Sequence, residues 1–312
     1  MFLGPEQGFD SRHLETSLPG GQPDHSIEQP SVEVHDSGER LGRATPEGLR
    51  DKVDKVVGLF CGEFRVDGKE AVEDELLRNP DAKFVIAASH FSNLDAPAAV
   101  KALGDILDVQ ITAESVLFEG LAPQRAMFRA AGAESFTPLS YRKEGTGKHG
   151  VFDPKDFDGL TRLIEGRKTP WLAVHPFTKA EEMQSAKVGA VYLAHKSGAK
   201  IIPTALDYEG GSVSLEGVAE LAKALLGRIK GEGRATYHVG KPIELSPLDV
   251  SVIENVFMKR AEGTPVSAEE RRAFVETVRQ LREQADGVAR VIADMLPEER
   301  RGQYGSPELR QK

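Results

Sequence analysis

The sequence predicts an α/β fold, a layered domain with a mixed, largely parallel sheet flanked by helices. A C-terminal helix and a disordered N-terminal tail complete the prediction. Short apolar runs alternate with amphipathic segments over residues 45–250, as expected for strands and helices that take turns around a parallel sheet. Residues 1–44 are rich in Gly, Pro, Ser, Asp and Glu and have no apolar periodicity, which indicates disorder. The predicted divisions are therefore 1–44 (acidic tail), 45–250 (α/β domain) and 251–312 (helical extension).

Turn and cap residues indicate where the elements begin and end. Thr45 suits a helix N-cap and Pro46 the first helical position, so a helix is expected over 45–60. Asp67-Gly68 is a turn signal after a short strand, and Gly198 is expected to stop a helix. Further strands are expected over 84–88, 109–113, 134–139, 169–177, 199–208 and from 234. Further helices are expected over 156–166, 185–198 and 217–231.

A long helix is expected from Ser267, where Ser-Ala-Glu-Glu forms a capping box. Its apolar residues step by four and three alternately, which makes a narrow seam suited to docking on the body or to pairing with another helix. Docking is the preferred interpretation because Gly287 interrupts the run. The apolar positions are Phe274, Val278, Leu281, Ala285, Val288, Ile292 and Met295.

Composition excludes several functions. The net charge is −9, and the acidic tail carries more than half of it, so a basic surface for nucleic acid is not expected. Cys61 is the single cysteine, which excludes an internal disulfide and a cysteine-cluster metal site. Neither a signal-peptide pattern nor an apolar run long enough to span a membrane is found. A cytoplasmic protein is therefore expected.

His90 and Asp95 lie between a predicted buried strand and an alanine-rich predicted helix. In one interpretation, Asp95 caps the helix and His90 is a hydrogen-bonded strand-end residue. In the other, the chain turns between them and the carboxylate reaches one imidazole nitrogen. It would then fix the tautomer and stabilise the imidazolium formed when the other nitrogen takes a proton from a substrate hydroxyl or water.

The stretch Ser-His-Phe-Ser-Asn-Leu-Asp resembles the first motif of the glycerolipid acyltransferases, a family that includes the 1-acylglycerol-3-phosphate acyltransferases. His90, Ser92 and Asp95 match the motif, and Ser89 replaces its leading asparagine. The resemblance covers residues 64–245. It implies that His90 is the general base, that Asp95 orients it, and that the protein acts in phospholipid biosynthesis.

The same resemblance implies the acceptor site. Arg142, with Lys143 beside it, occupies the place of a phosphate-binding arginine. Pro176 matches the third motif, Phe177 stands where that motif has a glutamate, and Lys179 lies near the place of its arginine. His175 is unexpected there, and a structural role at the strand end is predicted for it.

The implied reaction moves a fatty acyl group from acyl-CoA or acyl-carrier protein, as co-substrate, to a hydroxyl of a phosphorylated glycerolipid. No metal or bound organic cofactor is implied. Two alternatives stay open: a weakened member that binds lipid or a partner, and transfer to a non-phosphorylated alcohol or an amine. The helix at 218–230 is interpreted mainly as core. Transient contact with the inner face of the membrane, through its apolar side and basic residues, is the minority interpretation.

Overall fold

The computed structural model describes residues 44–114, 137–139, 154–175, 182–209, 226 and 233–306. The described part of the chain forms a seven-stranded sheet with the strand order β1-β7-β6-β2-β5-β3-β4. All neighbouring pairs are parallel except β6 and β7. The strands are β1 (Glu63–Asp67), β2 (Phe84–Ala88), β3 (Asp108–Glu114), β4 (Thr137–Leu139), β5 (Lys168–Ala173), β6 (Lys200–Tyr208) and β7 (Arg234–Val239).

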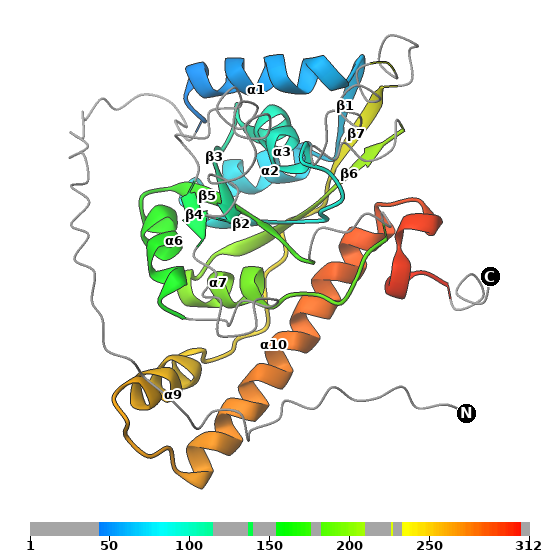
Figure 1. The fold of residues 1–312 in the computed structure, drawn as a ribbon. Helices are drawn as coiled ribbons and strands as arrows, with labels where there is room; N and C mark the ends of the chain where they lie inside the picture. Colours follow the sequence, from blue (N-terminus) through cyan, green and yellow to red (C-terminus); the bar gives the residue numbers. More distant parts are fainter. Residues whose placement is uncertain are drawn as a thin grey trace. The chain divides into compact units, whose positions relative to one another are not determined.

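Helices cover both faces of this sheet (Figure 1). Helices α1, α2 and α3 share one hydrophobic cluster with one face, and α6, α7, α9 and α10 share a second cluster with the other. This mixed α/β architecture confirms the predicted fold class. The helices are α1 (Glu47–Phe60), α2 (Glu70–Arg78), α3 (Asp95–Leu103), α6 (Asp156–Glu165), α7 (Gly189–Ser197), α9 (Ser251–Ala261) and α10 (Ala268–Asp294), followed by the 3-10 turns η3 (Glu298–Arg300) and η4 (Gly302–Tyr304).

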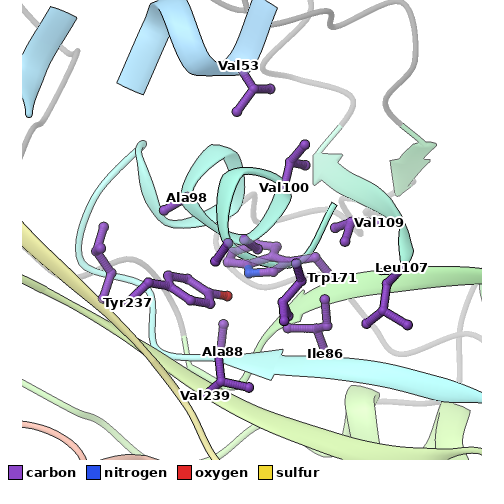
Figure 2. Packing of buried hydrophobic residues seen from close by; sticks show 14 of the residues in the cluster. Val53, Ile86, Ala88, Ala98, Val100, Leu107, Val109, Trp171, Tyr237 and Val239 are labelled. Carbon is purple, nitrogen blue, oxygen red and sulfur yellow. The ribbon is translucent and has the colours of Figure 1, made fainter. Parts of the chain in front are cut away.

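Strand β2 lies inside the sheet, between β5 and β6, and all five of its residues are buried. Because side chains alternate along a strand, Ile86 joins the cluster under α1 and α3, whereas Val85 joins the cluster under α7 and α10. Figure 2 shows the first cluster, in which Val53 of α1 and Val100 of α3 pack above Ile86 and Trp171. The carboxyl end of β2 is therefore held between two filled layers.

The start of α1 differs from the prediction. Thr45 does not cap the helix: the N-cap position is Pro46, and no side chain caps it. Instead, the buried Thr45 hydroxyl donates to the Leu107 carbonyl at 2.9 Å and accepts from the Val109 N–H at 2.9 Å. Thr45 thus ties the beginning of α1 to the start of β3, because a buried hydroxyl needs partners and the nearby backbone supplies them.

Other sequence signals are confirmed. The turn after β1 has Gly68 at φ +80°, and α7 ends at Gly198 at φ +66°, both in the left-handed region that glycine adopts without a steric penalty. Helices α2 and α9 were not predicted. The helix expected over 217–231 lies outside the described residues apart from Leu226, and the domain boundaries at 44 and 250 stay predictions.

Helix α10 docks on the sheet, as its seam predicted. Leu281, Ala285, Val288 and Ile292 are buried in the same cluster as Val85 of β2. None of the helices in the described ranges is both long and apolar enough to cross a membrane. The part of the α10 seam that carries these four residues is covered by the rest of the described chain.

We expect Ser267→Ala to lower the stability of the protein by about 1 kcal/mol, which corresponds to a fall in melting temperature of roughly 2–4 °C. Both bonds of the capping box are present: Glu270 N–H donates to the Ser267 hydroxyl at 3.2 Å, and Ser267 N–H donates to the Glu270 carboxylate at 2.9 Å. Ser267→Asp keeps an acceptor and should melt near the wild type. Equal melting temperatures for both variants would contradict the capping role.

Candidate active site

His90 and Asp95 face each other across a turn that follows β2. The turn is closed by the Asp95 carboxylate, whose Oδ2 accepts the backbone N–H groups of Phe91 at 2.7 Å and Ser92 at 2.8 Å. Asp95 is the first residue of α3, and no side chain caps that helix. The interpretation of Asp95 as an N-cap is therefore wrong, since its carboxylate binds the residues before it and not the helix after it.

The same carboxylate oxygen contacts the imidazole. The distance from His90 Nδ1 to Asp95 Oδ2 is 3.1 Å. Because Oδ2 already accepts two backbone N–H groups, it acts as an acceptor here as well, and the proton lies on Nδ1. In the neutral form of this ring, Nε2 is then the basic nitrogen. The spacing of five residues thus produces the contact, because the chain turns between them.

Burial distinguishes the two partners. The Asp95 side chain is 2% exposed, whereas the His90 side chain is 25% exposed. Burial raises the pKa of Asp95 above its usual value, and the hydrogen bonds from His90, Ser92 and Phe91 oppose that rise. The carboxylate is therefore shielded from water, while the imidazole remains accessible from outside.

Aromatic and polar side chains from neighbouring strands line the inner side of this pair. The Trp171 ring of β5 meets the His90 ring edge to face, with centroids 5.6 Å apart and planes at 78°. Tyr237 of β7 lies near Trp171 (Figure 2), and its hydroxyl donates to Thr204 of β6 at 2.9 Å. None of these three residues belongs to a recognisable motif in the sequence. Trp171 is the single tryptophan of the chain, and its place in a predicted buried strand was the available signal.

The serines of the first motif have structural contacts. The Ser92 hydroxyl accepts the Leu94 N–H at 3.1 Å, and the Ser92 carbonyl accepts the Asp95 N–H at 3.1 Å, so Ser92 shapes the turn. Ser89 is buried, and its N–H donates to the Thr204 carbonyl at 3.2 Å. The hydrogen bond from Ser89 to Thr204 continues the pairing of β2 with β6 by one residue.

His175 follows β5 and is 1% exposed. Its Nε2 accepts the backbone N–H of His90 at 3.2 Å, and its ring packs on Phe91 with centroids 5.0 Å apart. His175 thus lies buried just beyond the strand end, in contact with the backbone of His90. The contact also places this residue directly against the candidate base.

The predicted acceptor residues lie outside the described residues. These are Arg142, Lys143, Pro176 and Lys179. The structure thus brings together the first-motif residues and His175, and the phosphate-binding roles stay predictions. In the described part of the chain, no group of three or more His, Cys, Asp or Glu side chains is arranged to hold a metal ion.

The chain is similar to known proteins in its structure. No protein-family model matches the chain, and no curated protein matches it in sequence. Among solved structures, the chain is similar to the 1-acyl-sn-glycerophosphate (LPA) acyltransferase PlsC from Thermotoga maritima, with a TM-score of 0.39 and 15% sequence identity. The matched region covers 78% of this chain and 78% of that chain.

Proposed function

We propose that this protein is an acyltransferase that moves a fatty acyl group from acyl-CoA or acyl-carrier protein to a hydroxyl of a phosphorylated glycerolipid. The observation that carries the proposal is the contact between a buried carboxylate and a partly exposed imidazole, His90 Nδ1 to Asp95 Oδ2 at 3.1 Å. It occurs at the carboxyl end of a central strand, where α/β proteins place their ligands. The resemblance of the surrounding residues to the acyltransferase first motif supports the choice of reaction.

The chemistry follows from the two ring nitrogens. Nε2 of His90 takes the proton from the acceptor hydroxyl while the hydroxyl oxygen attacks the thioester carbonyl. The resulting imidazolium is stabilised by Asp95 through Nδ1. When the tetrahedral intermediate collapses, the carbon–sulfur bond breaks, and the thiolate leaves with the proton from Nε2. The products are the ester and the free thiol, and His90 returns to its neutral form.

The direct test is an assay of the purified protein with a panel of donors and acceptors. The donors are acyl-CoA and acyl-carrier protein, and the acceptors are a 1-acylglycerol-3-phosphate, its dephosphorylated form, a simple alcohol and an amine. We expect transfer to the phosphorylated acceptor. Transfer only to another acceptor would keep the chemistry and change the substrate class, and no transfer to any acceptor would overturn the proposal.

A second candidate is a weakened member of the same family that binds lipid or a partner protein. Phe177 favours it, because this residue stands where the resembling motif has a glutamate. Such a protein would bind the phosphorylated acceptor in equilibrium binding measurements but give no product in the assay above. For both candidate functions, we propose peripheral contact of the protein with the inner face of the membrane.

We expect Arg142→Ala to raise the KM for the phosphorylated acceptor about ten- to a hundredfold and to leave the KM for the donor nearly unchanged. A guanidinium holds two phosphate oxygens at once, and a hydrogen bond to a charged group contributes roughly 1.5–3 kcal/mol. Arg142→Lys should recover part of the loss, because an ammonium is a single point of charge. Steady-state kinetics with each substrate varied in turn would measure both constants.

The matched control is Arg279→Ala. Arg279 is on α10 and pairs with Glu276 and Glu283, so its loss should change neither KM. The dephosphorylated acceptor should be used equally poorly by the wild type and Arg142→Ala. If Arg142→Ala uses the phosphorylated acceptor as well as the wild type does, a non-phosphorylated alcohol becomes the better acceptor.

A further inference from the structure

The hydrogen-bond ladder between β2 and β5 changes partners just beyond the two strand ends. The Val174 N–H donates to the Ala88 carbonyl at 2.9 Å, which continues the parallel pairing. In a regular parallel ladder, the His90 N–H would then donate to the Val174 carbonyl. Instead, that carbonyl accepts the Lys187 N–H at 2.6 Å, and the His90 N–H donates to the imidazole of His175 at 3.2 Å.

A side chain therefore replaces the backbone acceptor at the residue that carries the candidate base. The next two N–H groups, of Phe91 and Ser92, are also held by a side chain, Oδ2 of Asp95. Three successive peptide N–H groups thus leave the sheet and are bound by His175 and Asp95. Between them, these two side chains direct the course of the chain from the strand end into the turn.

The surroundings of His175 hold its imidazole in the position needed for the hydrogen bond with the His90 N–H. Its side chain is 1% exposed and packs against the ring of Phe91, so the imidazole is fixed by its surroundings. Its Nε2 must be unprotonated to accept a hydrogen bond, so the ring is neutral with its proton on Nδ1. The contact links residues 85 positions apart, and it therefore couples the end of β5 to the orientation of His90.

We propose that His175 is a positioning residue for the His90–Asp95 pair, acting through the backbone N–H of His90. The bond fixes the peptide of His90 so that Nδ1 meets Oδ2 of Asp95 and Nε2 stays directed away from the carboxylate. His175 itself does not touch the reacting atoms. The kinetic consequence of this proposal rests on the acyltransferase function proposed above, but the structural consequence does not.

Two substitutions separate the hydrogen bond from the space that the ring fills. His175→Phe keeps a planar ring and removes the acceptor, whereas His175→Gln keeps an acceptor at a similar reach. We expect His175→Phe to lower kcat by about tenfold or more, because a buried N–H without a partner destabilises the geometry that holds it. The KM values for donor and acceptor should change less than about twofold, since no substrate contact is lost. His175→Gln should recover most of kcat.

Nitrogen-15 NMR of histidine-labelled protein at pH 8 gives a readout that does not depend on activity. In the wild type, both His90 and His175 should carry the proton on Nδ1 and show an unprotonated Nε2, with assignments from His90→Gln and His175→Gln. In His175→Phe, His90 should lose this single tautomer and give averaged nitrogen shifts. A His175 that carries its proton on Nε2 in the wild type would overturn the proposal even if His175→Phe does not fold.

The two readouts distinguish the possible failures. A His175→Phe variant with wild-type kcat and an unchanged His90 tautomer overturns the positioning role. If the wild type transfers no acyl group to any acceptor, the proposed function fails, and the NMR result alone decides the role of His175. A purely structural role predicts fewer folded molecules with unchanged kcat per folded molecule and the same loss in Gln and Phe, and this result would also overturn the proposal.

Discussion

His90→Ala is expected to abolish nearly all acyl transfer while the protein unfolds at close to the wild-type temperature. Nε2 of His90 is the proposed proton acceptor, and general-base catalysis contributes roughly 10²- to 10⁴-fold to a rate. The effect on folding should be small for two reasons. The side chain is already 25% exposed, and Asp95 Oδ2 keeps the N–H groups of Phe91 and Ser92 after the imidazole is removed. Turnover and thermal unfolding should be measured on the same preparations.

His195→Ala is the matched control for this substitution. His195 is on α7, where its Nε2 lies 2.8 Å from Oε1 of Gln284 on α10. Turnover of this variant should stay near the wild-type value. Activity of His90→Ala within tenfold of the wild type would exclude His90 as the base, and loss of the folded state would favour a structural role.

An element of the fold could be predicted from the sequence where the residues that determine it all lie within one segment. The buried runs that form β2 and β6 and the glycines at 68 and 198 gave the correct elements because burial and positive φ are local requirements. Helix α2 was missed because only Val72 and Leu76 supply its apolar face among nine residues rich in charge. Thr45 was misassigned because its partners, Leu107 and Val109, follow more than 60 residues later.

The candidate site also has one contact that could be predicted from the sequence and one that could not. The contact of His90 with Asp95 could be anticipated only on the condition that the chain turns between them, and the turn itself depends on Asp95 binding the backbone before it. The bond from His90 to His175 could not be anticipated, because it requires β2 and β5 to be neighbours in the sheet. Spacing along a sequence carries no information on which strands pair, so the role of His175 needed the structure.

Asp95→Asn should separate the structural role of the carboxylate from its electrostatic role. The amide oxygen of asparagine can still accept the N–H groups of Phe91 and Ser92, so the turn should persist. Asp95→Ala leaves both N–H groups without that acceptor in a buried turn, at a cost of about 1–3 kcal/mol for each group. Stability should therefore fall clearly in the alanine variant and much less in the asparagine variant, as measured by denaturant unfolding.

Stability should also depend on pH in a way that identifies the carboxylate. Burial raises the pKa of Asp95 in the folded protein above the ordinary value of 3.8, so the folded state binds the Asp95 proton more tightly than the unfolded state does. This contribution to stability is complete below the unfolded-state pKa and is lost as the pH rises through the folded-state pKa. Asparagine does not ionise, so the stability of Asp95→Asn relative to that of the wild type should increase as the pH rises above about 4. A constant difference between the two proteins over this range would contradict the burial effect.

Turnover should respond in the opposite direction to stability. The neutral amide can accept the Nδ1 proton of a neutral His90, but it cannot stabilise the imidazolium that forms when Nε2 takes the acceptor proton. We therefore expect Asp95→Asn to lower kcat by roughly 10²- to 10⁴-fold with little change in KM, although its fold is kept. Because this variant should keep the fold and lose only the negative charge of the carboxylate, it tests the contribution of that charge to catalysis. If Asp95→Asn is fully active, the carboxylate serves only to close the turn, and His90 does not need an anionic partner to act.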